Sequence, residues 1–356
     1  MGGNVSLHGE DATRIDLTKI NRTNTVSKLL QSLAKINEAY KKKFKMEMWT
    51  KQAFNSLAFL SGSAKHFFDL HSHKDDKFVA VKPTVGDIDT MVPLDQADLI
   101  LAFLDSIYKK TFGDLTFIGY KKSNGQYITL WKSKSLGYNI QVDLELVEFA
   151  NGLPTTWSSF SHSSHWTDMS QKIKGVFQKY ALRALSTKNI RPILLLKGKK
   201  KTPTVVTSTD IAFSPNGARY KLKPVLDEFG HIVKTDGLET FEETTPQDTG
   251  YVTDLDVMFE MFFGRFPTKD DLDKFGSFIG VVDLVKHTWS PDHQKNFIMG
   301  FANTLWGQAS QKMYRGNAGD DLKEKTAAFE YLLGQLTVNY DEVTVNDWKT
   351  KFYAAY

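Results

Sequence analysis

The sequence predicts an α+β fold, in which helices cover one face of a mixed β-sheet and a β-rich insertion leads to a C-terminal helical domain. Three observations predict it. Helix-like and strand-like stretches alternate early in the chain, short alternating segments separated by turns follow, and apolar residues at helical spacing fill the last part. We expect an N-terminal arm, a sheet domain, a helix with the β-rich insertion, and a helical accessory domain: 1–24, 25–150, 151–250 and 251–356.

The composition excludes several classes of protein. A chain of 356 residues with 41% hydrophobic residues can bury a full core. No apolar run approaches the roughly 18 residues of a membrane span, and the first residues lack the features of a secretory signal, so we expect a cytoplasmic protein with no membrane partner. The absence of cysteine excludes disulfides, thiolate zinc sites and a cysteine nucleophile. The net charge of +4 is too small to indicate nucleic-acid binding by itself.

The chain begins with a polar arm and a long helix. The first six residues, MGGNVS, fit the pattern for acylation of Gly2, and a flexible leader is the alternative that we favour. The arm continues without a clear period to Asn24. Apolar residues at three- and four-residue steps then predict a helix from Val26 to the lysine run Lys41–Lys43, where positive charge suits the helix dipole. The oligomeric state is not indicated.

Two short strands and a short helix are expected next. Leu57–Leu60 is apolar and precedes the turn Ser61-Gly62-Ser63. It fits either the last turn of a helix over Met46–Ser56 or a strand, and we favour the strand. A short helix is expected over Ala64–Phe68, and a second strand over Phe78–Lys82, which Pro83 would end. Between them, the segment 69–77 carries histidines and aspartates that fit either a zinc site or a solvated loop, and we favour the loop.

The rest of the sheet follows in order. The spacing predicts a helix over Asp95–Lys110. Strands are expected over Thr116–Lys121 and Tyr127–Lys132, joined through Asn124-Gly125, which is a strong hairpin signal. A further strand is expected over Tyr138–Leu146.

A strand is also expected over Asp87–Val92, so acidic residues lie on two of the predicted strands. Side chains alternate between the faces of a strand, so Asp87 and Asp89 are expected to share one face while Ile88 faces the core. Asp143 and Glu145 share the polar face of the later strand. Three carboxylates on one sheet face repel one another unless cations bind them, so the pattern indicates a metal site. Either Asp143 or Glu145 fits as the third acid, and we prefer Asp143.

The order of these motifs resembles the nucleotidyltransferase superfamily that includes DNA polymerase beta, poly(A) polymerases and CCA-adding enzymes. The resemblance covers 57–149 and rests on three stretches, which are Phe59-Leu60-Ser61-Gly62-Ser63, Gly86-Asp87-Ile88-Asp89-Thr90-Met91-Val92 and Val142-Asp143-Leu144. The sequence departs from the compact members of that family in one respect, because the insertion at 69–77 lengthens the gap between the turn and the acid pair.

The resemblance implies a role for each motif. Gly62 and Ser63 would contact a triphosphate, and Lys65 is a further nucleotide-binding candidate. Asp87 and Asp89 would bind two Mg²⁺ (or Mn²⁺) ions, and the acid at 143 would complete the site. The expected partners are therefore a nucleoside triphosphate and a nucleic-acid acceptor, with the 3′ hydroxyl of a tRNA-like RNA placed first. Alternatives are a protein or small-molecule acceptor, and a non-catalytic nucleic-acid-binding or assembly protein on the same fold.

The second half contains further candidates. The stretch Trp157–Asp168, rich in serine, histidine and tryptophan, fits a helix cap with aromatic anchors, or a base contact. A helix is expected over Met169–Leu185, a β-rich insertion over Thr204–Glu243, an acidic linker over Glu239–Asp248, and helices that include Lys269–Val285. Cations that fit either a nucleic-acid contact or a solvated surface are Lys172, Lys174, Lys197, Lys199, Lys200 and Lys201.

Overall fold

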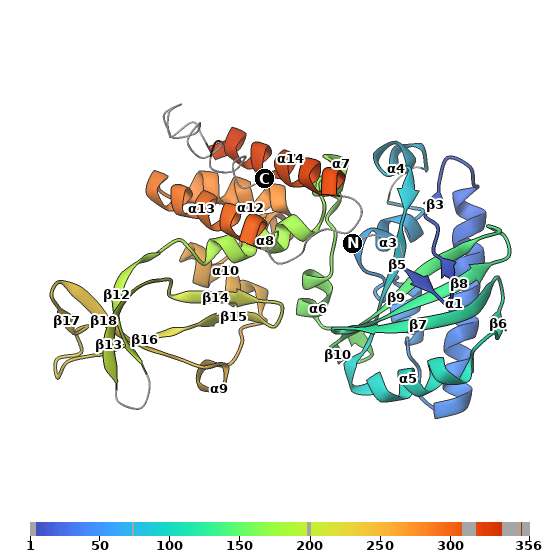
Figure 1. Cartoon of the computed structure of the whole chain (residues 1–356), viewed down its shortest axis with the longest axis horizontal. Coiled ribbons are helices and arrows are strands. Elements are labelled where there is room, and N and C mark those ends of the chain that lie inside the picture. The colour runs from blue at the N-terminus through green and yellow to red at the C-terminus, as the bar shows by residue number, and fades with distance from the viewer. Residues whose placement is uncertain (1–4, 73–74, 198–200, 308–317, 337–349, 351–356) are drawn as a thin grey trace. The chain divides into compact units, whose positions relative to one another are not determined.

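The computed structural model describes residues 5–72, 75–197, 201–307, 318–336 and 350 (Figure 1). The chain divides into two compact units at Lys172, and Ile173 begins the second. Both units combine helices with strands, so the α+β class is confirmed. Within the described ranges, every helix is too short or too polar to cross a bilayer.

The first unit is built on a mixed sheet of five strands. The strand order is β5-β9-β8-β7-β6, in which β5 and β9 are parallel and the other neighbours are antiparallel. The hairpin between β7 and β8 turns at Gly125, whose φ is +73°, as its sequence predicts. The strands are β5 Asp87–Pro93, β6 Thr111–Phe112, β7 Leu115–Ser123, β8 Gln126–Ser133 and β9 Asn139–Val147.

Helices and short strands complete this unit. The helices are α1 Arg22–Phe44, α2 Lys51–Asn55, α3 Gly62–Phe68, α4 Asp75–Val81, η1 Leu94–Gln96, α5 Ala97–Ser106, α6 Thr156–Ser161 and α7 Trp166–Ser170. The short strands are β1 Ser6–Leu7, β2 Glu10–Asp11, β3 Ile15–Asp16, β4 Thr84–Val85, β10 Phe149–Ala150 and β11 Leu153–Pro154. Apolar side chains of α1 and α5 share one core with Ile88 of β5 and Val142 of β9. The opposite face of these two strands therefore remains for polar groups.

Two predicted strands in this unit are wrong. Leu57–Leu60 forms a turn that makes one antiparallel bridge, between Leu60 and Thr90. Residues 78–82 lie mostly in α4, where Phe78 is buried while its neighbours at 76 and 77 are exposed. An apolar run this short fits either structure, and the acidic residues at the start of α4 favour a helix.

A buried arginine at the start of α1 stabilises the end of α3. Arg22 is 3% exposed, and its guanidinium donates to the backbone carbonyls of His66 at 2.7 Å, Phe67 at 2.9 Å and Asp69 at 3.1 Å. The same group lies 4.5 Å from the ring centroid of Phe78. These carbonyls have no partner within the helix, so the cation satisfies groups that burial would otherwise leave unpaired.

We therefore expect Arg22→Ala to lower the free energy of unfolding by about 3 kcal/mol, because it leaves buried carbonyls without a donor. Arg14→Ala is the matched control, since Arg14 is an exposed arginine in the segment that precedes α1, and it should change stability by less than about 0.5 kcal/mol. Urea denaturation measures both. Equal losses for the two variants would contradict a role for Arg22 in holding α3.

The second unit combines a β-rich part with a helical part. Its main sheet has the order β13-β12-β18-β16, with β17 also pairing with β18, and β12 and β18 are parallel. Strands therefore occupy most of the range 204–243 that was expected to be β-rich. The strands are β12 Arg191–Lys197, β13 Thr202–Ser208, β14 Ile211–Ser214, β15 Gly217–Tyr220, β16 Leu222–Pro224, β17 Lys234–Thr235 and β18 Leu238–Glu243.

The helices of the second unit pack around aromatic residues. They are α8 Val176–Leu185, α9 Pro246–Thr249, α10 Leu255–Phe263, α11 Lys269–Phe275, α12 Phe278–Thr288, α13 Pro291–Gly307 and α14 Ala318–Leu336. Phe278 of α12 contacts Phe177 of α8 and Phe301 of α13. The sequence also predicts a closing helix over Val345–Tyr356, and most of that range lies outside the described residues.

Three sequence predictions for the second half are corrected. The expected linker 239–248 begins as β18, because Thr240 and Phe241 are buried against the sheet. The expected helix 169–185 is interrupted between α7 and α8, where Lys172 has φ +60°. The expected helix 269–285 breaks at Ser277, whose hydroxyl accepts from the Gly280 amide at 2.9 Å and starts α12.

Candidate metal site

Three aspartates meet on neighbouring strands of the first unit. In the parallel pairing of β5 with β9, Asp89 lies opposite Asp143, and Asp87 lies opposite Gln141. The two-residue period of β5 places Ile88 in the core and the aspartates on the other face, as the sequence predicts. Asp143 and Gln141 share a face of β9 for the same reason.

The carboxylates are close enough to bind a common ion. One oxygen from each of Asp87, Asp89 and Asp143 lies within 4.8 Å of the others. Among the described residues, this is the one group of three or more ligand-type side chains that converges in this way. Carboxylate oxygens suit hard cations such as Mg²⁺ and Mn²⁺, so the donor set fits those metals.

Burial and mutual repulsion disfavour the charged forms. The pKa of Asp89 is raised well above its usual value, first by burial and then by the negative charges of Asp87, Glu145 and Asp143. Burial also raises the pKa of Asp143 to about 7, although a hydrogen bond from Gln141 acts in the opposite direction. A cation bound among these carboxylates would offset both pKa shifts, since it supplies positive charge where water is excluded.

The glycine–serine turn lies against this cluster. The Met91 amide donates to the Phe59 carbonyl at 2.6 Å, and the Ser61 amide donates to the Asp89 carbonyl at 3.1 Å. These bonds hold the turn along the edge of β5 next to Asp89. Gly62 has φ +53°, and a Cβ atom at this position would collide with the Asp89 carboxylate. The sequence therefore needs glycine here both for its backbone angle and for space.

The Gly62 amide is not aimed at a ligand. It donates to the His162 carbonyl at 2.9 Å, as part of a bridge between Gly62 and Ser163. The implied contact between this amide and a triphosphate is therefore not supported. Ser63 is 8% exposed at the start of α3, and the Lys65 side chain is exposed on the same helix. These two side chains remain candidates for phosphate contacts.

We expect Gly62→Ala to weaken Mn²⁺ binding, because the added methyl group displaces the Asp89 carboxylate. Gly125→Ala is a matched control, since Gly125 also has positive φ but nothing lies within 4 Å of a Cβ atom there. Both variants should lose roughly 1 kcal/mol of stability from backbone strain. Calorimetric titration with Mn²⁺ separates them, and equal affinities in the two variants would contradict the contact.

The structure distinguishes the two candidates for the third acid. The Glu145 carboxylate accepts a hydrogen bond from the Ser61 hydroxyl at 2.6 Å, and its strand position lies opposite Met91 rather than an aspartate. Asp143 converges with Asp87 and Asp89 instead. Glu145 therefore anchors the turn to β9, and Asp143 fits the third ligand position.

Sequence reasoning missed three residues at this site. Lys82 follows α4, and its positive charge acts on Asp89 against the upward pKa shift. Gln141 and Ser61 hydrogen-bond Asp143 and Glu145, respectively. Gln141 was detectable, because it lies two residues before Asp143 and so shares its face. Lys82 and Ser61 were not, because their positions depend on contacts between segments distant in the sequence.

The predicted basic contacts do not gather into a described surface. Lys174 forms an ion pair with Glu324, and Lys201 forms one with Glu242 at 2.6 Å. Lys172 is exposed. Lys199 and Lys200 lie outside the described residues, as does the side chain of Lys197. Two of the three described lysine side chains are therefore paired with acidic partners within the protein, without reference to a nucleic acid.

The histidine and tryptophan segments have structural partners. His66 Nε2 lies 2.6 Å from the Ser164 carbonyl, and His71 is exposed on the loop after α3. Thr155 caps α6 by accepting from the Ser158 amide, and Trp157 is 7% exposed. Within the segment 157–168, His165 caps α7 by accepting from the Thr167 amide at 3.3 Å, which agrees with the cap interpretation. Residue 73, in the zinc alternative, lies outside the described residues.

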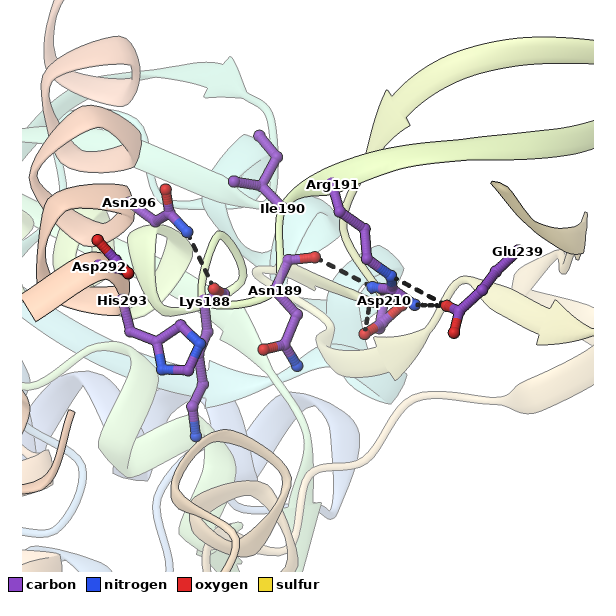
Figure 2. Close-up of a pocket in the computed structure, with 9 residues that line it drawn as sticks. All are labelled: Lys188, Asn189, Ile190, Arg191, Asp210, Glu239, Asp292, His293 and Asn296. Carbon is purple, nitrogen blue, oxygen red and sulfur yellow. Dashed lines mark hydrogen bonds and ion pairs between the residues drawn. The ribbon is translucent and has the colours of Figure 1, made fainter. Parts of the chain in front are cut away.

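A hollow of about 510 Å³ in the second unit differs from the aspartate cluster, because basic as well as acidic residues line it. Figure 2 shows three of its charged groups bonded to one another: Arg191 donates to Asp210 at 2.9 Å and to Glu239 at 3.3 Å. The Lys188 ammonium donates to the Phe262 carbonyl at 3.1 Å. These cations are used within the protein, so we favour the aspartate cluster as the candidate site.

Comparisons with family models, curated proteins and solved structures find no match to this chain.

Proposed function

We propose that the protein is a metal-dependent nucleotidyltransferase, which moves a nucleotidyl group from a nucleoside triphosphate to an acceptor hydroxyl. One observation carries the proposal. Asp87, Asp89 and Asp143 converge on neighbouring parallel strands, beside a turn that presents Ser63 and Lys65 on a short helix. Acidic residues that bind divalent cations next to groups able to contact phosphate are what this reaction requires.

The three aspartates would hold Mg²⁺ or Mn²⁺. The bound cations supply charge neutralisation at the phosphates and lower the pKa of the acceptor hydroxyl. The fit rests on the donor set, because three partly or fully buried carboxylates with oxygens within 4.8 Å of one another need positive charge between them.

The side chains of the site are assigned the remaining roles in the transfer reaction. The acceptor oxygen forms a bond to the α-phosphorus while the bond to the β-phosphate oxygen breaks, and pyrophosphate leaves. Asp143 is the group that we assign to accept the hydroxyl proton, because its carboxylate lies within the cluster that would hold the metal. Ser63 and Lys65 are assigned to the β- and γ-phosphates, through hydroxyl and ammonium donors. Gly62 acts by leaving space for Asp89.

We place the 3′ hydroxyl of a tRNA-like RNA first among acceptors, with protein and small molecules as alternatives. This order rests on the resemblance of the acidic motifs to RNA-extending nucleotidyltransferases. The alternative of a non-catalytic nucleic-acid-binding protein gains no support from the structure, because Lys174 and Lys201 form ion pairs with acidic residues of the protein.

The test is incubation with each labelled nucleoside triphosphate, Mg²⁺ and a pool of host RNA, DNA and protein. We expect label in the RNA fraction, and we expect chelation of the metal to prevent labelling. Label in the protein fraction would keep the reaction but change the acceptor. If no fraction is labelled with any triphosphate, the proposed activity is wrong, and nucleic-acid binding should then be measured as a function of salt.

A further inference from the structure

We propose that Gln141 is a positioning residue for the aspartate cluster, and that the backbone of Val5 in the N-terminal arm fixes the orientation of its amide. This inference deepens the proposed function and rests on it for the catalytic part. Gln141 lies on β9 opposite Asp87, and only 5% of it is exposed. It thus occupies the aspartate face of the sheet without being a ligand.

Gln141 binds both oxygens of one carboxylate. Its Nε2 donates to Oδ1 and to Oδ2 of Asp143, each at 2.9 Å. Because the donor contacts both oxygens, it limits rotation of the Asp143 carboxylate about the Cβ–Cγ bond. The lone pairs that do not accept from Gln141 are directed away from it. A hydrogen bond of this kind also favours the ionised form, which is the form that binds metal.

The arm determines which end of the amide faces Asp143. The Val5 amide donates to Gln141 Oε1 at 3.2 Å. A backbone N–H can only donate and an ionised carboxylate can only accept, so the oxygen of Gln141 must face Val5 and its NH₂ group must face Asp143. Reversing the amide would break the bond to Val5 and both bonds to Asp143.

Val5 is itself held in place by the arm. The Ala12 amide donates to the Val5 carbonyl at 2.9 Å, next to the pairing of β1 with β2. The Thr13 amide donates to the Asn139 carbonyl at 2.8 Å, and the Asn139 side chain donates to Glu10 at 2.9 Å. These bonds attach the arm to the start of β9, two residues before Gln141. The N-terminal arm is therefore connected to a metal-ligand candidate through a single side chain.

Two variants remove different parts of this connection. Gln141→Leu removes the donor to Asp143 and keeps a side chain of similar size. Val5→Pro removes the backbone N–H, although it also fixes φ at this position, and it leaves the Gln141 side chain intact. Val5→Ala is its control, because it keeps the N–H. Circular dichroism and thermal unfolding of each variant show whether the fold is retained.

Mn²⁺ binding, followed by loss of the free-ion signal in electron paramagnetic resonance, is the first measurement. We expect Gln141→Leu to weaken binding by about 10- to 100-fold, as for other partners of metal ligands. Val5→Pro should weaken it by a smaller factor and Val5→Ala should not change it. The double variant Gln141→Leu/Val5→Pro should bind no more weakly than Gln141→Leu alone, since Val5 acts on Asp143 only through the Gln141 side chain.

Steady-state kinetics at saturating metal is the second measurement. Because Gln141 contacts a ligand side chain and no phosphate contact is assigned to it, Gln141→Leu should lower kcat while the KM for the nucleoside triphosphate stays within about twofold. A merely structural role would not separate kcat from KM or make the two substitutions non-additive.

The outcomes separate this inference from the proposed function. If the wild type binds Mn²⁺ and transfers no nucleotide, while Gln141→Leu binds Mn²⁺ more weakly, the proposed activity fails and the positioning role is supported. If the wild type is active and Gln141→Leu retains its Mn²⁺ affinity and its kcat, the positioning role alone is overturned. Additive effects of the two substitutions overturn the role of Val5. A wild type that binds no Mn²⁺ overturns both proposals.

Discussion

Asp89→Asn is expected to lower nucleotidyl transfer by roughly a thousandfold or more, while the protein remains folded. Asp89 is the most heavily constrained of the three acids, because burial and the charges of Asp87, Glu145 and Asp143 all act on it. Asparagine keeps the shape of the side chain and removes the negative charge that holds a cation. The change should therefore remove metal binding and turnover together.

The measurement compares the rate of label transfer and the Mn²⁺ affinity with those of Asp236→Asn. Asp236 is exposed in the turn between β17 and β18, so its substitution tests the same chemical change outside the site. The control should behave as the wild type does. Thermal unfolding without metal should show that Asp89→Asn is at least as stable as the wild type, because one repelling charge is gone. Retained activity in Asp89→Asn would rule out the proposed assignment.

The stability of the metal-free protein is expected to fall as the pH rises through the pKa of Asp143. Its pKa is about 7 in the folded protein and 3.8 for an ordinary aspartate, so the folded state binds this proton more tightly than the unfolded state. The stabilisation that comes from protonated Asp143 is fully present below pH 3.8. It is lost progressively as the pH rises towards the folded-state pKa of about 7. Between about pH 5 and pH 8 the loss amounts to about 3 kcal/mol.

Urea denaturation in the presence of a chelator, at several pH values, tests this dependence. Asp143→Asn removes the titrating group, so the difference in stability between wild type and variant isolates Asp143 from histidines that titrate in the same range. We expect the wild type to lose more stability than the variant as the pH rises. Adding Mn²⁺ at pH 8 should stabilise the wild type and have a much smaller effect on Asp143→Asn. Parallel pH profiles would show that Asp143 is not perturbed.

The strands that carry the acids were predictable because their pattern is local. In β5 and β9, apolar residues alternate with polar ones, and this period places Asp87, Asp89 and Asp143 on the polar side whatever surrounds them. The hairpin was predictable for a similar reason, since Asn124-Gly125 suits one kind of two-residue turn. Such signals need no information about distant parts of the chain.

Short or ambiguous segments were not predictable in the same way. Residues 78–82 are apolar enough for a strand, yet they fold mostly into α4, where Phe78 meets Arg22. Residues 238–243 are acidic enough for a linker, yet they form β18, because pairing with β12 buries Phe241. In both cases a partner distant in the sequence decides the structure, and local propensity is too weak to oppose it.

The sequence by itself determined that two acidic strand faces and a glycine–serine turn exist, because side-chain alternation and backbone freedom are local properties. Only the tertiary structure decided how they meet. The parallel register of β5 with β9 sets Asp89 opposite Asp143, the edge contact of the turn leaves room only for Gly62, and the arm directs Gln141 onto Asp143. These arrangements depend on hydrogen bonds between segments far apart in the chain, and no local pattern specifies which segments pair.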